Sequence, residues 1–168
     1  TGTVRVLNQT VSGKLEMPAA YDVGAGPISL SAGDFDMDRR ADLVVASAGS
    51  SSFAFLFQNA TGGFDTSPAL RVASRPVRVQ LSEVDRDGLP EVWLLSEDGN
   101  LSMFRSDSYG GILPAQNYST GSGSGTMVLE DIDGNGQTGV VLALGSSTVY
   151  TLISREPQNG KARDLSTM

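Results

Sequence analysis

Short apolar runs alternate with polar turns along the whole chain, and one such arrangement occurs three times. The three copies begin at Pro27, Pro76 and Gly125. In each copy an alternating run leads into an acidic loop, and a more continuous apolar run leaves it. Alternation predicts a half-exposed strand, whereas a continuous run rich in β-branched residues predicts a strand buried on both faces. Each copy therefore predicts two β-strands joined by an acidic loop.

A third apolar run follows each pair of predicted strands. The three runs are Phe53–Phe57, Leu101–Phe104 and Val149–Ile153. A Gly-Gly or Asn-Gly pair follows each of them, which indicates a turn, and then a weaker fourth strand. No segment longer than a turn has helical periodicity. The sequence thus predicts an all-β protein with four strands in each copy.

The repeat length is regular, because the first acidic residues of the loops, Asp34, Glu83 and Asp131, are spaced by 49 and 48 residues. Four strands in a unit of roughly 40–50 residues are typical of a β-propeller blade. We therefore expect about three and a half four-stranded antiparallel blades. The predicted divisions are a half blade over 1–26, blades over 27–75 and 76–123, and a final blade over 124–168.

This number of blades predicts an incomplete ring, because closed propellers contain about four to eight blades. An open stack also leaves strand edges exposed. Two arrangements satisfy these facts: a segment of a longer propeller, or a subunit whose copies assemble around a ring or along a fibre. We favour the first, and Thr1 at the first position agrees with removal of an upstream segment.

The acidic loops carry the chemistry that metal ions require. In the first loop, carboxylates stand at positions 1, 3, 5 and 9, counted from the first acidic residue, and position 7 can offer its main-chain carbonyl; the residues are Asp34, Asp36, Asp38, Asp42 and, at position 7, Arg40. Ca²⁺ takes six to eight oxygen ligands. Four carboxylates within about 4–6 Å would repel one another by several kcal/mol, and a divalent cation reverses that cost. The first loop therefore predicts a Ca²⁺ site.

The other two loops vary this pattern. The second predicts ligands at Glu83, Asp85, Asp87, Leu89 (carbonyl) and Glu91. The third predicts ligands at Asp131, Asp133, Asn135 and Gln137 (carbonyl). Gly139 replaces the ninth-position acid in the third loop, so we expect Ca²⁺ to bind the first two loops and to bind the third weakest or not at all. The alternative for any one loop is a hydrated Asx-type turn without metal.

One further departure concerns position 6 of the first loop. Arg39 stands where the second and third loops have Gly88 and Gly136. A left-handed backbone at this position would cost a non-glycine residue about 1–2 kcal/mol.

The run from Gly33 to Val45, Gly-Asp-Phe-Asp-x-Asp-x-x-x-Asp-Leu-Val-Val, resembles the FG-GAP/VCBS repeats of integrin-α-type propellers. The resemblance extends over essentially the whole chain and rests on three copies. It implies propeller blades in which the loop between the first two strands binds calcium. Such repeats also occur in bacterial adhesins, lectins, polysaccharide lyases and toxin components, so the resemblance does not specify a biological role.

Composition excludes several kinds of chemistry. The chain contains no His and no Cys, which excludes Ser-His-Asp, Cys-His and His-zinc sites within it. A net charge of −7 disfavours binding to a nucleic-acid backbone. No run approaches the ~20 apolar residues of a membrane span. Glu91 and Glu130 could suggest a glycosidase pair, but the second loop accounts for Glu91, and we predict no catalytic residue.

Four Asn-x-Ser/Thr triplets are candidate glycosylation sites; their asparagines are Asn8, Asn59, Asn100 and Asn117. Glycosylation at these positions would mark a secreted protein. Asn8 and Asn59 also fall at predicted turns, where asparagine is favoured for backbone reasons. Trp93 and the alternating Phe53, Phe55 and Phe57 lie within strands, so we expect them to pack in the core rather than to stack on a ligand.

Together these features predict a calcium-stabilised, non-catalytic, secreted module that binds a protein or glycan, as in cell adhesion. An alternative is a structural subunit that oligomerises through open blade edges. Another is a fragment of a propeller enzyme or lectin that acts on polysaccharide.

Overall fold

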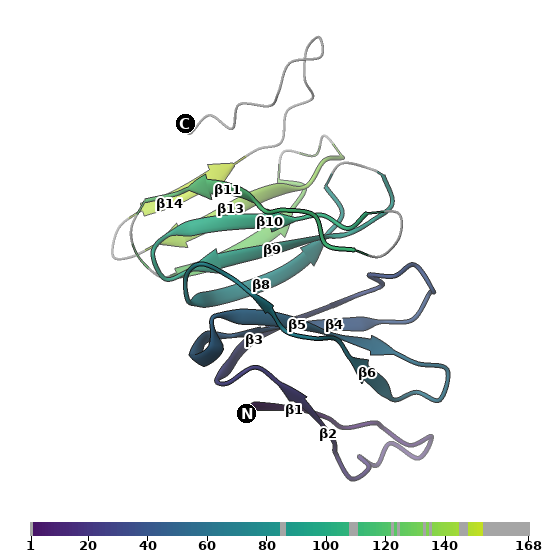
Figure 1. The fold of residues 1–168 in the computed structure, drawn as a ribbon. Helices are drawn as coiled ribbons and strands as arrows, with labels where there is room; N and C mark the ends of the chain where they lie inside the picture. Colours follow the sequence, from purple (N-terminus) through teal and green to yellow (C-terminus); the bar gives the residue numbers. More distant parts are fainter. Residues whose placement is uncertain are drawn as a thin grey trace.

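The chain folds as an all-β protein, as the hydrophobic pattern predicts (Figure 1). The computed structural model describes residues 2–84, 87–107, 111–121, 123, 125–132, 134, 136–144 and 148–152. These residues contain strands and a single 3₁₀ turn, Ala48–Ser50, and no helix among them is long and apolar enough to cross a membrane. The strands are β1 (Gly2–Val6), β2 (Ala19–Val23), β3 (Pro27–Gly33), β4 (Asp42–Ser47), β5 (Ser52–Gln58), β6 (Phe64–Thr66), β7 (Leu70–Arg71), β8 (Pro76–Ser82), β9 (Glu91–Ser96), β10 (Asn100–Phe104), β11 (Gln116–Ser119), β12 (Gly125–Glu130), β13 (Gly139–Leu144) and β14 (Thr148–Leu152).

The strands form antiparallel sheets that follow one another along the chain. The sheets are β1-β2, then β3-β4-β5-β6 with β7 also on β5, then β8-β9-β10-β11, and finally β12-β13-β14. Apart from β7, which pairs with β5, each strand pairs with a sequence neighbour, so the sheets are meanders. The β3–β4 ladder shifts register next to Pro27, and the β8–β9 ladder shifts next to Pro76. Proline has no N–H to donate to a ladder, which accounts for a shift at each of these positions. The two shifts occur at the same place in two copies of the sequence repeat.

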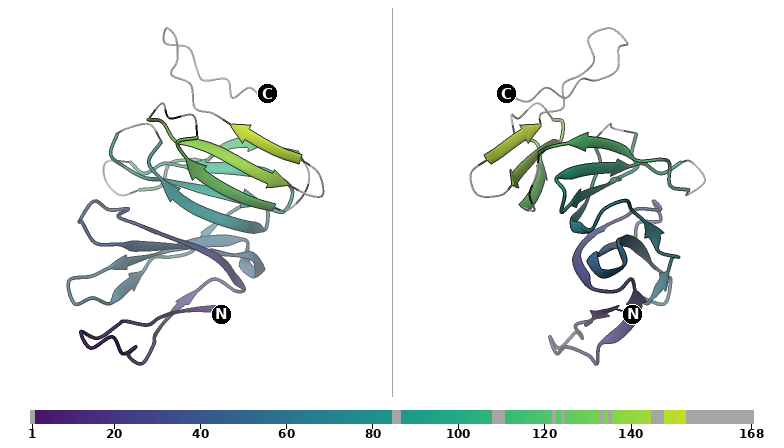
Figure 2. Two further views of the ribbon diagram at one scale, coloured as in Figure 1. Left: turned by 180° about the vertical axis from the view of Figure 1, so that it is seen from behind. Right: turned by 60° about the vertical axis from the view of Figure 1, so that its left-hand side comes forward.

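Consecutive sheets lie face to face in chain order (Figures 1 and 2). Three hydrophobic clusters occupy the spaces between them. In β4 the side chains alternate between two of these clusters: Val45 joins the cluster towards the β1-β2 sheet, and Val44 and Ala46 join the cluster towards the β8-β11 sheet. The strand that leaves the acidic loop is therefore buried on both faces, as its continuous apolar run predicts.

The strand aromatics singled out by sequence pack in the core or, for the half-buried Phe57, against it. Phe53 and Phe55 are buried, and Trp93 is buried and stacks on Tyr118 with ring centroids 6.2 Å apart. The prediction that they pack in the interior is confirmed.

One position shows how packing depends on the preceding sheet. Leu30, Val79 and Met127 each lie four residues before the first acidic residue of a loop. Val79 and Met127 are 1% and 3% exposed and pack against the sheet before their own. Leu30 follows a two-stranded sheet and is 54% exposed. The same sequence position is thus a core position only where a wider sheet covers it.

Candidate metal centre

The three acidic loops share a local backbone conformation at position 6. Arg39, Gly88 and Gly136 have φ angles of 69°, 86° and 77°. Position 4 is also left-handed in the first and third loops, where Met37 and Gly134 have φ angles of 62° and 70°. Only glycine adopts this left-handed region without strain, so the first loop holds two strained residues where the third has glycines.

Three backbone-to-carboxylate hydrogen bonds recur between loops. The position 2 amide donates to the position 9 carboxylate in the first two loops: Phe35 N to Asp42 Oδ2 and Val84 N to Glu91 Oε2, both 3.0 Å.

The position 6 amide donates to the position 1 carboxylate in the first and third loops: Arg39 N to Asp34 Oδ2, 2.9 Å, and Gly136 N to Asp131 Oδ2, 2.7 Å. The position 7 amide donates to the position 5 carboxylate in the first two: Arg40 N to Asp38 Oδ1 and Leu89 N to Asp87 Oδ1, both 2.8 Å. The acidic residues thus fix the curvature of the loops.

Asp42 ties the first loop to the sheet. It is the first residue of β4, it is completely buried, and its Oδ1 accepts the Gln58 amide at 2.9 Å. Arg40 Nε donates to the Gln58 carbonyl at 2.8 Å. The end of β5 is therefore held by two loop residues. Phe35 anchors the loop from the other side, because its buried ring stacks on Phe55 with centroids 4.3 Å apart.

Three carboxylates of the first loop converge. One oxygen each from Asp34, Asp36 and Asp42 lies within 4.8 Å of the other two. Asp34 Oδ2 accepts the Arg39 amide, whereas Asp34 Oδ1 is buried and has no hydrogen-bond partner. A buried carboxylate oxygen without a partner is costly, and a cation would remove that cost. The residues present therefore fit a hard divalent cation such as Ca²⁺.

The electrostatics of Asp36 reflect the same convergence. Burial raises the pKa of Asp36 above its ordinary value of 3.8, and the negative charges of Asp42, Asp38 and Asp34 raise it further. A hydrogen bond from the Asp38 amide opposes this rise. The cluster is thus short of positive charge at the place where its three oxygens meet.

In the first loop the side chains of Asp38 and Arg40 pair with each other. The Asp38 carboxylate pairs with the Arg40 guanidinium and accepts the Arg40 amide, and it is outside the group of three converging carboxylates. Arg40 therefore neutralises Asp38 within the loop. The structure brings together positions 1, 3 and 9 and leaves position 5 in an ion pair.

The second and third loops are described in part. In the second, Glu91 is buried, and its Oε1 lies 3.7 Å from Arg105 Nε. Asp85 of the second loop and Asp133 and Asn135 of the third lie outside the described residues. In the third loop, Gly139 is buried and offers no side-chain ligand at position 9, and Gln137 is half-buried.

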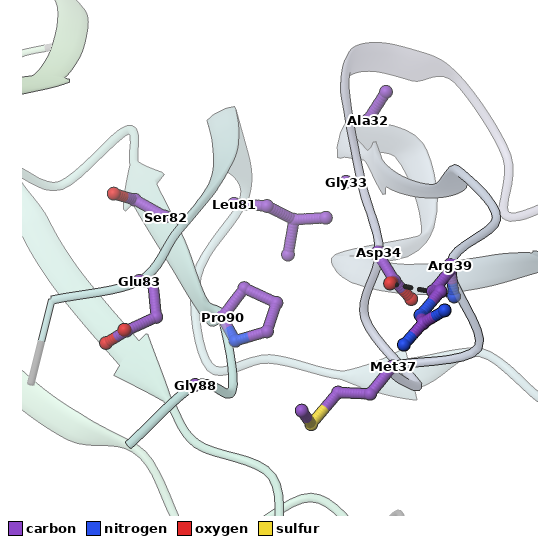
Figure 3. A pocket seen from close by; sticks show the side chains of 10 residues that line it. All are labelled: Ala32, Gly33, Asp34, Met37, Arg39, Leu81, Ser82, Glu83, Gly88 and Pro90. Atoms are coloured by element: carbon purple, nitrogen blue, oxygen red, sulfur yellow. Dashed lines mark hydrogen bonds between the residues drawn. The ribbon is translucent and has the colours of Figure 1, made fainter. Parts of the chain in front are cut away.

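A cleft of about 550 Å³ separates the first loop from the second (Figure 3). Leu81 and Pro90 form one wall, and Asp34 and Arg39 form the other. Met37 extends between the walls, and its methyl group lies 3.8 Å from where a side chain at Gly88 would begin. Four of the residues that line the cleft were singled out by sequence as parts of the acidic loops: Asp34, Arg39, Glu83 and Gly88. The sequence signal for the rest is weak, because their role depends on two neighbouring repeats lying side by side.

The four candidate glycosylation sites differ in their surroundings. Asn8 and Asn117 are exposed. Asn59 shapes the turn after β5: its Oδ1 accepts the amides of Thr61 and Gly63, and its Nδ2 donates to Asp65 at 3.3 Å. Asn100 Nδ2 donates to Asp98 Oδ2 at 2.8 Å. The turn role expected for Asn59 is therefore present in the structure.

No known protein family matches the chain, and no curated protein matches it. The arrangement of its own residues must therefore carry any functional conclusion.

Proposed function

We propose that the chain is a run of β-propeller blades of the FG-GAP/VCBS type, stabilised by Ca²⁺ in their acidic loops, and that it acts as a non-catalytic extracellular interaction module. The observation that carries this proposal is the first loop. There, oxygens of Asp34, Asp36 and Asp42 lie within 4.8 Å of one another, and Asp34 Oδ1 is buried without a partner. The meander sheets stacked in chain order support the blade assignment.

Ca²⁺ would supply positive charge and additional oxygen coordination at this point. Carboxylates offer about four lone-pair sites, so Asp42 can accept the amides of Phe35 and Gln58 and still contact a cation. A cation that binds only the folded chain stabilises it by mass action, by about 2.7 kcal/mol at 100 times its dissociation constant. The role of the metal in this proposal is structural: it holds the loop that joins β3 to β4.

The test is thermal unfolding in EGTA, followed by addition of excess CaCl₂, together with calorimetric titration of the metal-free protein. We expect the melting temperature to rise in Ca²⁺ by several degrees, because about 1 kcal/mol corresponds to about 2–4 °C in a domain of this size. Mg²⁺ at the same concentration is the control, since it prefers a tighter octahedral site. An unchanged melting temperature together with no heat of binding would refute the metal assignment.

A further inference from the structure

We propose that copies of this chain associate head to tail, so that the exposed face of β3 in one copy packs on the exposed outer face of the last sheet, β12-β13-β14, in the next. This inference goes beyond the proposed function, because it identifies the partner as a second copy of the chain. The contact uses no carboxylate of the acidic loops, so the Ca²⁺ proposal and the association proposal can fail independently.

The template for this contact lies inside the chain, where the β3-β6 sheet meets the β8-β11 sheet (Figure 2). There β8 packs on the first two strands of the preceding sheet, and Val79 lies in one hydrophobic cluster with Val44 and Ala46. The Val79 amide also donates to the Ser29 hydroxyl of β3 at 3.2 Å. The first strand of a sheet thus packs on a hydroxyl, a valine and an alanine of the sheet before it.

The exposed face of β3 is the counterpart of the β8 surface in this template. Leu30 occupies the same repeat position as Val79, four residues before the first acidic residue of the loop. Val79 is 1% exposed, whereas Leu30 is 54% exposed. Ala32, two residues further along β3, is also exposed. β3 therefore carries a first-strand packing surface that the described residues leave open to solvent.

The outer face of the last sheet matches the surface on which Val79 packs. The cross-strand pairs are Thr126–Ala143 and Val128–Val141 in the last sheet, and Ser29–Ala46 and Ser31–Val44 in the template. A hydroxyl, a valine and an alanine thus recur in the same register. Ala46 is buried in the template, whereas Ala143 is exposed and Val128 is 49% exposed. This face is therefore built to receive a first strand, and Leu30 is the matching residue that lacks cover.

The β1-β2 sheet shows where the second copy fits. The turn after β1 repeats the turn after β10, the third strand of its sheet. The bridges are Gln9–Leu15 and Ser106–Ile112, and the turn bonds run from Thr10 N to Lys14 O and from Asp107 N to Gly111 O, both 2.8 Å. β1 and β2 therefore correspond to the third and fourth strands of a sheet. Among the described strands only β2 pairs with β1, so the edge that β10 uses to pair with its second strand, β9, is open on β1.

A second copy supplies the two missing strands. When its last sheet stacks on β3 as in the template, its β12 lies over β3, and its β13 lies beside β1. β1 then takes the place on β13 that β14 has within one chain. Such a strand exchange replaces one antiparallel ladder by another, so it costs little, and burial of Leu30 and Val128 favours it. Because the two contacting surfaces differ, the interface is heterologous.

The test is gel filtration with light scattering on the unsubstituted chain in excess CaCl₂ and ~0.15 M salt, where charges on separate copies are largely screened. The contact is small and of the transient kind, so we expect a monomer at about 1 µM and assemblies of two or more copies at about 200 µM. A monomer over the whole range overturns the proposal.

Leu30→Asp and Val128→Asp each disable one of the two surfaces. Each variant alone should remain monomeric, with the dissociation constant raised at least about tenfold, because burial of an unpaired charge is costly. An equimolar mixture should form a one-to-one complex, since the intact β3 face of the Val128→Asp copy meets the intact outer face of the Leu30→Asp copy. A mixture that stays monomeric, or a single variant that associates like the unsubstituted chain, overturns the head-to-tail contact.

Leu113→Asp is the matched control. Leu113 is 43% exposed and follows β10 in a sheet that has a hydrophobic cluster on each face, so Leu113→Asp should associate as the unsubstituted chain does. A loss as large as that of Leu30→Asp would assign the effect to added charge and overturn the proposal. Thermal melting at low concentration checks that each variant folds. If an Asp variant melts much lower, Leu30→Gln and Val128→Gln replace the pair in the same mixture experiment, with the same two outcomes deciding it.

Discussion

The Phe35 amide donates to Asp42 Oδ2 across the first acidic loop, at 3.0 Å. The same bond joins Val84 to Glu91 in the second loop, also at 3.0 Å, although the acid is one methylene longer there. In both loops a buried ninth-position acid closes the turn onto the residue after the first acid. This acid therefore has a structural role in the loop whether or not a metal is bound.

We expect Asp42→Asn to destabilise the protein in both EGTA and Ca²⁺. An amide provides one accepting oxygen where Asp42 uses two, so either the Phe35 or the Gln58 amide loses its acceptor; a buried unsatisfied donor costs about 1–3 kcal/mol. The loss should be larger in Ca²⁺, because a ligand charge also disappears. Urea unfolding under both conditions measures the two losses. Equal losses would separate Asp42 from the metal site.

Asp36→Asn and Asp38→Asn form a matched pair of variants. They test whether the Ca²⁺ ligands are only the carboxylates that converge in the structure or all the acids that the residue spacing predicts. Asp36 belongs to the converging group, whereas Asp38 is paired with Arg40. We expect Asp36→Asn to lower the Ca²⁺ affinity about tenfold or more, because the charge of the ligands tunes calcium affinity. Asp38→Asn should change the Ca²⁺ affinity by less than about threefold. Calorimetric titration of each variant provides the measurement. A larger loss for Asp38→Asn would indicate that the Arg40 pair opens when the metal binds.

Much of the fold follows from local patterning, since the alternating and continuous runs that flank each loop are a half-exposed edge strand and a central strand buried on both faces. Val79 and Leu30 mark the limit of that reasoning. Their local patterns are alike, yet one is 1% and the other 54% exposed. The difference comes from the width of the preceding sheet, which a single repeat does not encode.

The candidate site was also predictable only in part. Residue spacing correctly identifies Asp34, Asp36 and Asp42 as neighbours. It gives Asp38 the same status, because the competition from the Arg40 guanidinium depends on side-chain conformation rather than on spacing. The cleft was not predictable at all, since Leu81 and Arg39 line the same cleft only when two repeats pack together.

The raised pKa of Asp36 predicts an unusual dependence of stability on pH in the metal-free protein. A carboxyl whose pKa is higher in the folded state than in the unfolded state binds protons more tightly when folded, so its contribution to stability is lost as pH rises through that window. The window begins near the ordinary value of 3.8 and extends upwards. In EGTA, Asp36→Asn should therefore be more stable than the unsubstituted protein at pH 7.

The control is the same comparison at lower pH, by urea unfolding at several values between pH 7 and about pH 4. The advantage of Asp36→Asn should shrink as Asp36 takes up its proton. In excess Ca²⁺ at pH 7, the unsubstituted protein should instead be the more stable of the two. An advantage that does not change with pH would assign the effect to something other than the charge of Asp36.

Arg39→Gly and Gly88→Ala test the shared left-handed position in opposite directions. Replacing a left-handed arginine by glycine removes strain and raises the free energy of unfolding by about 1–2 kcal/mol. The greater conformational entropy of glycine in the unfolded chain lowers it by about 0.5–1 kcal/mol. Arg39→Gly should thus stabilise the protein by about 0.5–1 kcal/mol. Gly88→Ala should destabilise the protein by a similar or larger amount, because alanine is strained at the left-handed φ of Gly88. No steric clash adds to this cost, since the new Cβ meets only Met37 Cε, at 3.8 Å, an ordinary contact. Denaturant unfolding in EGTA keeps metal effects out of both values.

Val79→Ala and Leu30→Ala test whether the sheet interface, rather than the strand itself, stabilises these positions. Val79 is 1% exposed and packs against the β3-β6 sheet. Its truncation should cost about 1.5–3 kcal/mol, the range for a fully buried aliphatic side chain. Leu30 is 54% exposed, so its truncation should cost less than about half as much despite removing a larger side chain. Urea unfolding of the two variants gives the comparison. Equal costs would mean that Leu30 is covered in solution, and hydrogen exchange of the β3 amides would then show protection.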